Sequence, residues 1–434
     1  MLDLLVIGGG AAGTVAVLKA VSASKRVALV RKGYGALALC PGVIHLPQGV
    51  RPESSPRHPH RRHYPQWVQR RGDDPGRLWS SVQNSITVWK NALESEGFLL
   101  EGALEGNGGE NLSLMNEVGN VQTPALALQS LSRGDLSQWK GRRVVLVNLE
   151  GVHHFPLERI REGILRNFGG LREVDLEIRS LRFREWGPFG GVPMEVVSRG
   201  MDGIDLAMKL AQKVRDLLRR ERWDRVGFPP VLGGERHVEV YRLIQETVES
   251  PCFEWLPLSS GLIGLRWQKA IDRILEKKKI ERIEARAVQP VFHKQRLSGV
   301  YVETSQGRSV LEARNFILAT GKFFGGGVPS FPPWRESIFG APLYLKSELM
   351  DRHSAYAYLN PVSLKPQSIL GCGIRVDEQM RPLNEQGEPL FENLYAAGSL
   401  LGGDDDTGGG MGYALASGYT AVEEAFASSE GGKI

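Results

Sequence analysis

A glycine-rich turn near the start of the chain constrains the fold more than any other feature of the sequence. It reads Gly8-Gly9-Gly10-Ala11-Ala12-Gly13. An apolar run over residues 2–7 precedes the turn, helix-forming residues 11–22 follow it, and a second apolar run covers residues 26–30. A buried strand, a GxGxxG turn, a helix and a second buried strand, in this order, predict the first half of a dinucleotide-binding βαβ unit.

Each glycine of this motif has its own physical role. Gly8 permits the tight turn, Gly10 lets the backbone approach a pyrophosphate with no Cβ in the way, and Gly13 lets the helix pack close to the strand. The free N–H groups and the positive dipole end of the helix then attract the anion. We therefore predict cofactor contacts at Gly8, Gly9, Gly10, Ala12 and Gly13.

The end of the second predicted strand departs from the dinucleotide fingerprint. The fingerprint places an acidic residue there to bind ribose hydroxyls, whereas this chain has Arg31 and Lys32. We count both as candidate cofactor contacts, because a basic side chain could meet a phosphate and Arg31 could stack on adenine. Three alternatives stay open: FMN, which has no adenosine; degenerate cofactor binding; and an ordinary surface arginine.

Three further glycine motifs lie in the last third of the chain. The first ends a buried apolar run at residues 315–320, the second follows a strand at residues 393–396, and the third opens a last helix at residues 412–427. Glycines before a helix let the backbone and the helix dipole approach a flat flavin ring, which is negatively charged when reduced. The predicted flavin contacts are Thr320, Gly321, Gly398, Ser399, Gly410 and Met411.

The segment between the N-terminal and C-terminal motifs predicts a second domain. Apolar runs alternate there with helical patterns, which is typical of a parallel sheet covered on both faces. We predict an inserted parallel α/β domain over residues 141–279. The fold class is then α/β, with a two-segment Rossmann-type FAD/NAD(P)-binding domain made of residues 1–140 and 280–434. A three-stranded meander is predicted over residues 284–313.

Charge and hydropathy exclude several classes of function. The 54 basic and 49 acidic residues give a net charge of only +5, and no basic stripe is interleaved with aromatics, so nucleic acid is not an expected partner. No run reaches the roughly 20 apolar residues of a membrane helix. The apolar start runs directly into glycines and lacks the basic region of a signal peptide, so we expect a cytoplasmic protein.

Cysteine usage and one biased segment bear on partners. The chain has three cysteines, far apart in sequence, and we therefore expect no disulfide framework, no iron–sulfur cluster and no metal site in this chain alone. Residues 51–71 are rich in proline, arginine and histidine. Proline prevents regular structure and like charges repel, so we predict a mobile basic loop there and consider it a candidate docking surface.

The motifs together resemble a known flavoprotein group. The GxGxxG turn, the Ala319-Thr320-Gly321 strand end, the segment 373–377 and Ala397-Gly398-Ser399 resemble the group that contains fumarate reductase and glycerol-3-phosphate dehydrogenase. The segments 321–327 and 398–403, the basic end of the second strand and the inserted domain resemble in particular the B subunit of anaerobic glycerol-3-phosphate dehydrogenase. The resemblance spans nearly the whole chain and is weakest over residues 51–71.

The resemblance implies a flavin-binding redox subunit of a three-part complex. A sister FAD-containing subunit would oxidise sn-glycerol 3-phosphate, and a membrane-associated iron–sulfur subunit would pass the electrons to a quinone. The cofactor would be FAD, with FMN as the alternative, and the chain would be cytoplasmic and peripherally membrane-associated through a partner. A self-sufficient FAD-dependent dehydrogenase or reductase of the fumarate reductase type, a flavin-free scaffold subunit, and another donor such as lactate remain alternatives.

No motif marks a catalytic residue. A flavin enzyme that removes hydride from a carbinol needs a base near the ring and a cation to fix an anion. The candidates are His45, His353, Arg335, Arg352 and Arg375. Each is explained more simply as a surface or hydrogen-bonding residue, so the sequence assigns no catalytic residue.

Overall fold

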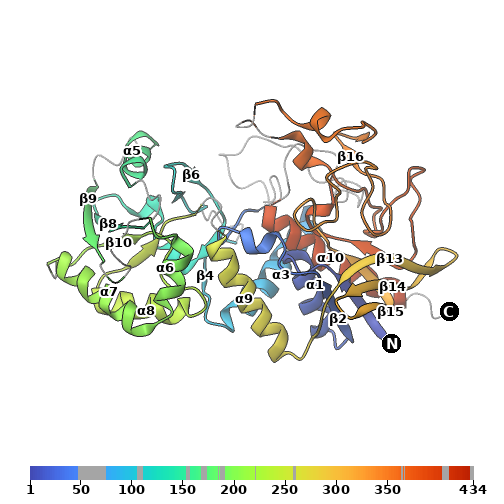
Figure 1. The fold of residues 1–434 in the computed structure, drawn as a ribbon, viewed down its shortest axis with the longest axis horizontal. Helices are drawn as coiled ribbons and strands as arrows, with labels where there is room; N and C mark the ends of the chain where they lie inside the picture. The colour runs from blue at the N-terminus through green and yellow to red at the C-terminus, as the bar shows by residue number, and fades with distance from the viewer. Residues whose placement is uncertain are drawn as a thin grey trace.

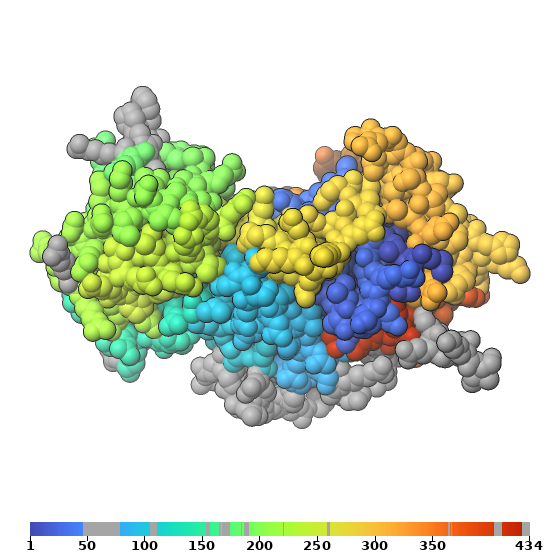
Figure 2. Space-filling model, turned by 90° about the horizontal axis from the view of Figure 1, so that it is seen from below, coloured from blue at the N-terminus to red at the C-terminus, as the bar shows by residue number. Residues whose placement is uncertain are grey.

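The computed structural model describes most of the chain as an elongated molecule with two lobes. The described residues are 1–46, 75–104, 111–152, 157–167, 174–183, 185, 191–219, 221–257, 261–362, 365, 367–402 and 410–430. In Figure 1 both chain ends lie in one lobe, and the green segment between β8 (Arg143–Glu150) and α8 (His237–Val248) forms the other. Figure 2 shows the same division from below. The predicted basic loop at 51–71 lies outside the described residues.

A seven-stranded sheet forms the centre of the larger lobe. Its parallel part runs in the order β12 (Glu281–Glu284), β2 (Val27–Arg31), β1 (Leu2–Ile7) and β15 (Gly307–Leu318), and β18 (Leu394–Ala396) pairs with β15. Strands from both ends of the chain thus share one sheet. All five residues of β2 are buried, as expected for a parallel strand covered on both faces. The predicted two-segment Rossmann-type fold is confirmed.

Strand β15 takes part in two kinds of pairing. Its first half pairs antiparallel with β14 (Arg296–Thr304), which in turn pairs with β13 (Arg286–His293). Its second half, from Ala313 to Leu318, runs parallel to β1. The sequence predicted two separate strands here. Residues 308–318 contain no glycine or proline. The strand therefore continues without a break from its exposed first half into the core.

Four long helices pack in the core of the larger lobe. They are α1 (Ala11–Ser22), α3 (Pro75–Glu94), α9 (Leu262–Lys277) and α10 (Gly410–Glu430). The predicted boundary at residue 279 assigns α9 to the inserted domain. The structure packs its buried face, including Trp267, into the same core cluster as β1 and β2. The rings of Trp267 and Trp89 of α3 lie 5.9 Å apart in an edge contact.

The second lobe is built on a four-stranded sheet. Its order is β11 (Cys252–Glu254), β10 (Arg225–Phe228), β8 and β9 (Asp175–Arg182), and every pairing is parallel. One face carries a core cluster that includes residues of α7 (Ile204–Leu217) and α8. The other face carries a second cluster with residues of α5 (Leu157–Asn167). The alternation of strands and helices in the sequence thus corresponds to a doubly covered parallel sheet.

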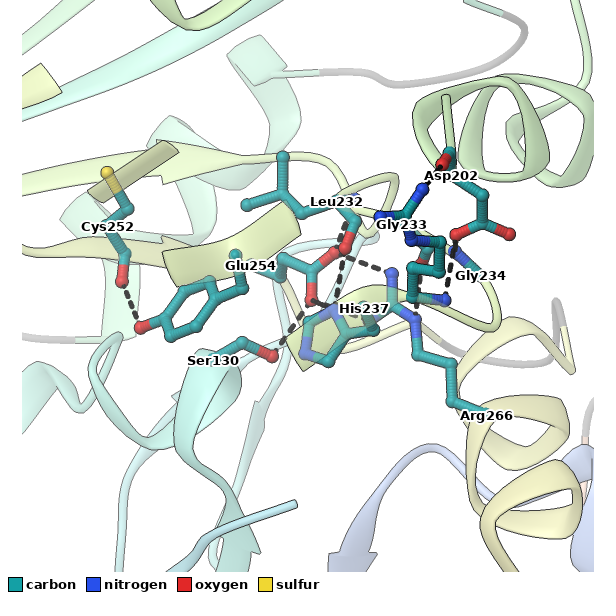
Figure 3. A network of polar contacts seen from close by, with 11 residues as sticks. Ser130, Asp202, Leu232, Gly233, Gly234, His237, Cys252, Glu254 and Arg266 are labelled. Atoms are coloured by element: carbon teal, nitrogen blue, oxygen red, sulfur yellow. Dashed lines mark hydrogen bonds and ion pairs between the residues drawn. The ribbon is translucent and has the colours of Figure 1, made fainter. Parts of the chain in front are cut away.

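A buried ion pair joins the two lobes. Glu254 of β11 and Arg266 of α9 are fully buried, with two hydrogen bonds of 2.7 and 2.9 Å between them (Figure 3). Ser130 Oγ and the backbone N–H of Leu232 also donate to Glu254, and Arg266 Nε donates to the carbonyl of Gly233. Because α9 packs on the first core and β11 on the second, this network ties one lobe to the other.

Shorter elements complete the described part of the fold. They are η1 (Ala36–Leu39), β3 (Val43–Ile44), β4 (Leu100–Gly102), β5 (Leu114–Met115), β6 (Val121–Gln122), β7 (Leu126–Leu128), α4 (Gln129–Ser132), η2 (Leu136–Gln138), α6 (Met194–Met201), β16 (Tyr344–Leu345), β17 (Glu348–Leu349), η5 (Ala355–Tyr358), η6 (Ser368–Gly371) and η7 (Gly398–Leu400). Within the described ranges, no helix combines the length and the apolar character that crossing a bilayer requires.

Candidate functional site

Three of the predicted glycine motifs end neighbouring parallel strands. Gly8 follows β1, Gly398 follows β18, and Gly321 lies just beyond β15, which pairs with both of these strands. All three glycines have a positive φ, of 117°, 83° and 72° respectively. Because the carboxyl ends of parallel strands meet at one edge of a sheet, segments about 300 residues apart or more in sequence come together there. We call this the glycine edge.

The first turn of α1 fits an anionic group. An ideal Cβ on Gly8 would lie 2.2 Å from the carbonyl oxygen of Ala319, and one on Gly13 would lie 1.9 Å from that of Gly8. A Cβ on Gly10, in contrast, would meet nothing within 4 Å. Helix α1 has no side-chain cap and no acidic residue in its first turn. Open space beside an uncapped helix N-terminus is what a pyrophosphate requires.

The first turn of α10 meets the segment that connects β2 to α3. The backbone N–H of Gly412 donates to the carbonyl of His45 over 3.3 Å. The sulfur of Met411 lies 3.6 Å from Sγ of Cys40. Desolvation raises the pKa of the Cys40 thiol to about 11, so this group stays protonated and neutral near pH 7. Gly410 has a φ of +61° and begins the helix without an acidic residue in its first turn.

Helices α1 and α10 approach each other very closely beside the glycine edge. A Cβ on Gly418 would lie 2.3 Å from the carbonyl oxygen of Ala12, and one on Gly398 would lie 3.0 Å from the Cβ of Ala12. The backbone N–H of Gly398 donates to Oγ of Ser417. Ala12 therefore lies in the helix contact. Ser417 and Gly418 were not among the predicted contacts, although a Ser-Gly pair inside a predicted helix signals a close packing contact.

The remaining predicted contacts after β15 and β18 differ in their surroundings. Oγ1 of Thr320 is buried without a hydrogen-bond partner among the described residues, and it would lie 2.4 Å from a Cβ on Gly327. Ser399 is exposed, and its Oγ lies 3.5 Å from the ideal Cβ position of Gly321. Lys322, which follows Gly321, donates to the carbonyl of Leu370, and desolvation lowers the pKa of its ammonium group.

The basic end of β2 has carboxylate partners that the sequence did not reveal. Arg31 is nearly buried and binds Asp272 of α9 and Glu284 of β12. Lys32, the next residue, is exposed. The positive charge that sets this chain apart from the dinucleotide fingerprint is therefore matched by negative charge. Neither acid could be linked to Arg31 from the sequence, since the contact depends on the order of β2 and β12 in the sheet.

The five candidate catalytic residues have different surroundings. The backbone of His45 binds the first turn of α10, and desolvation lowers the pKa of its imidazole. Arg375 donates to the carbonyl of Ser347 and lies over the ring of Tyr344. The others lie in the same loop region. Arg335 binds Glu385, His353 is exposed, and Arg352 lines an open pocket of about 400 Å³.

Comparisons with known proteins agree with the resemblance drawn from the motifs. Residues 3–180 match the family described as FAD binding domain. The B subunit of anaerobic glycerol-3-phosphate dehydrogenase from Pasteurella multocida is 22% identical over 433 residues, covering 97% of this chain and 98% of the relative. The protein of that name from Vibrio cholerae is 23% identical over 457 residues, covering 98% of this chain and 97% of the relative.

Among solved structures, 3-ketosteroid Δ1-dehydrogenase of Sterolibacterium denitrificans aligns with 98% of this chain and 99% of its own, at 10% identity and a TM-score of 0.39. The similarity to the two B subunits extends over both segments of the glycine edge, whereas the family match covers the first segment. The chain thus contains a match to the FAD binding domain family over residues 3–180 and is similar, over nearly its whole length, to B subunits of anaerobic glycerol-3-phosphate dehydrogenase.

Proposed function

We propose that this chain is the FAD-dependent redox subunit of a glycerol-3-phosphate dehydrogenase-like complex. One observation carries the proposal: motifs from both ends of the chain meet at the glycine edge, beside the N-terminus of α1 and against Ser417 of α10. The names of the homologues support the reaction and the subunit role. When bound, the flavin supplies the capacity to accept an electron pair and to pass it on.

Different segments at and beside the glycine edge would hold different parts of the flavin. The open space at Gly10 and the first turn of α1 would hold the pyrophosphate. The first turn of α10 would favour negative charge on the reduced ring through the positive end of its helix dipole. Cys40 and Met411, in contact with each other, would keep water from that side of the ring.

The proposed partners are the subunits that would exchange electrons with the flavin of this chain. The three cysteines are free, and among the described residues no group of three or more histidine, cysteine and acidic side chains could hold a metal ion. We propose that the electrons leave through another chain, because the relatives are named as subunits. The proposed partners are a sister FAD-containing dehydrogenase subunit and an iron–sulfur, membrane-associated subunit towards a quinone. The chain would be peripheral to the membrane through that partner.

An anaerobic reduction experiment tests this proposal. The purified chain, loaded with flavin, is mixed with sn-glycerol 3-phosphate alone and then with the co-expressed sister and iron–sulfur subunits. We expect the visible flavin absorbance to be retained in the first mixture and to be bleached in the second by more than the flavin of the sister subunit accounts for. Bleaching of the isolated chain by the substrate would instead support a self-sufficient dehydrogenase. A folded chain that takes up no flavin would support the scaffold alternative.

A further inference from the structure

The side chain of Arg31 lies beside the predicted phosphate loop. An ideal Cβ on Gly9 would lie 2.9 Å from Cδ of Arg31, so the stem of this side chain runs directly against the turn. Arg31 is also the last residue of β2. In a dinucleotide-binding unit, the end of the second strand is where the adenosine ribose lies, and an acidic side chain there accepts hydrogen bonds from its two hydroxyls.

Two carboxylates surround the guanidinium of Arg31. Its Nε donates to Oε1 of Glu284 over 2.7 Å, and its two terminal nitrogens donate to Asp272 over 2.6 and 3.3 Å. Asp272 also accepts from Gln268, over 3.3 Å, and forms an ion pair with Arg282 at 3.3 Å. The cation at this position is therefore neutralised and does not present a free charge to a phosphate.

The side chains of Arg31, Asp272 and Glu284 differ in the fraction that is exposed to solvent. The side chain of Arg31 is 7% exposed and that of Asp272 is 16% exposed, whereas that of Glu284 is 55% exposed. Asp272 already interacts with three neighbouring residues. The group that the cluster presents to solvent, and so to a ligand, is the carboxylate of Glu284.

Strand pairing places that carboxylate close to the fingerprint position. Glu284 is the last residue of β12, and it is the register partner of Arg31 in the parallel pair of β12 and β2. Neighbouring strands lie about 4.8 Å apart. Glu284 therefore lies one strand away from the position at which the dinucleotide fingerprint has its acidic residue. It stays at the same edge of the sheet, and Arg31 fixes the direction of its side chain.

We infer that Glu284 binds the ribose hydroxyls of the adenosine half of FAD and that Arg31 is the positioning residue for it. The assignment rests on the proposed flavin function and deepens it, because FMN has no adenosine and gains nothing from this carboxylate. A charge-assisted hydrogen bond to a sugar hydroxyl is strong enough to set the preference between the two flavins. The chain therefore selects FAD, although its second strand ends in a basic residue.

Flavin affinity, measured with both flavins, tests the assignment. The flavin is removed from the purified chain, and dissociation constants for FAD and FMN are determined by quenching of flavin fluorescence. The Glu284→Gln variant keeps the shape of the side chain and a contact to Arg31 but loses the charge. We expect FAD binding to weaken about tenfold, in line with the loss of a hydrogen bond to a charged group, while FMN binding is unchanged.

A matched control and a second variant complete the experiment. Glu281→Gln changes an exposed glutamate at the other end of the same strand and should alter neither dissociation constant. Arg31→Met should lower the ratio of FAD to FMN affinity in the same direction as Glu284→Gln, which a general loss of folding would not do. A near-ultraviolet circular dichroism spectrum verifies that each variant is folded.

The possible outcomes separate this inference from the proposed function. Unchanged FAD affinity in the Glu284→Gln variant, or equal losses for FAD and FMN, would overturn the inference and leave the flavin function intact. A wild-type chain that binds FMN more tightly than FAD would overturn the inference in the same way. A wild-type chain that binds neither flavin would overturn both.

Discussion

At the scale of single residues, the glycines of the first turn have different tasks. Gly10 faces open space and has a φ of −78°, which any residue adopts, so a methyl group there fits the protein alone. The Cβ of an alanine at position 13 would collide with the backbone of Gly8. Gly10→Ala should therefore leave the melting temperature almost unchanged and weaken flavin binding at least tenfold, because its methyl group enters the space predicted for the pyrophosphate.

The Gly13→Ala variant is the counterpart of that prediction. It should lower the free energy of unfolding by about 1–3 kcal/mol, as overpacking against fixed backbone does. Thermal unfolding and flavin titration of the two variants measure both quantities. A Gly10→Ala chain that binds flavin as tightly as wild type would show that the cofactor does not approach this turn.

A buried histidine makes the stability of the chain depend on pH. His237 begins α8, bonds through Nδ1 to the carbonyl of Leu232 and stacks on Phe98 and Tyr241. Desolvation lowers its pKa to about 4, from an ordinary value of 6.5. Between these two pH values the imidazole of His237 is protonated in the unfolded chain and neutral in the folded chain. The free energy of unfolding should thus fall as the pH drops from about 6.5 to about 4, by at most about 3 kcal/mol.

The His237→Phe variant isolates this contribution. It keeps an aromatic ring between its two neighbours and removes the titratable group. Urea unfolding at a series of pH values should show a smaller loss of stability between pH 6.5 and pH 4 than in the wild type. If both chains lost stability with the same slope, the histidine would not be the group responsible.

The residue scale also shows why part of the site could be predicted and part could not. The glycines at positions 8 and 13 lie close together in sequence, so their close backbone packing was predictable from spacing alone. The contact of Arg31 with Asp272 and Glu284 bridges more than 200 residues. It depends on which strand lies beside β2, and charge patterns along the chain carry no such information.

At the scale of elements, helix α9 determines how the lobes are joined. The alternating pattern of strands and helices predicted α9 as part of the inserted domain, because pattern shows that a helix exists but not which sheet it covers. Its buried face packs in the larger lobe, while Arg266 reaches the fully buried Glu254 (Figure 3). The sequence likewise predicted β15 as two separate strands, because its first half is largely exposed and its last residues are buried.

Removing one partner of the buried ion pair should be costly. Arg266→Met leaves the charge of Glu254 buried without its counter-ion, and we expect a loss of about 3–5 kcal/mol in the free energy of unfolding. The double variant Glu254→Leu with Arg266→Met removes that charge and should recover part of the loss. Urea unfolding of both variants and the wild type measures the difference.

A surface ion pair on the same helix is the control for that experiment. Lys269 binds Glu235 over 3.2 Å, and both side chains are well exposed. Lys269→Met should cost less than about 1 kcal/mol. The structural account of the lobe contact fails if Arg266→Met is no more harmful than Lys269→Met.

At the scale of the whole molecule, the glycine edge and the second sheet occupy different lobes. The glycine edge gathers residues from the first and last segments of the chain, and no residue of the second sheet is needed to form it. This separation suits a subunit that holds a cofactor in one lobe. The fold class was predictable because the motifs at both chain ends belong to one known pattern. The relative placement of the lobes was not predictable, because it depends on buried contacts such as that of Glu254 with Arg266.

The identity of the bound cofactor tests the central claim most directly. The purified chain is denatured with acid, and the released yellow compound is identified by chromatography against FAD and FMN. The account predicts release of FAD in a stoichiometric amount. A properly folded chain that is colourless and cannot be reconstituted with either flavin would contradict it.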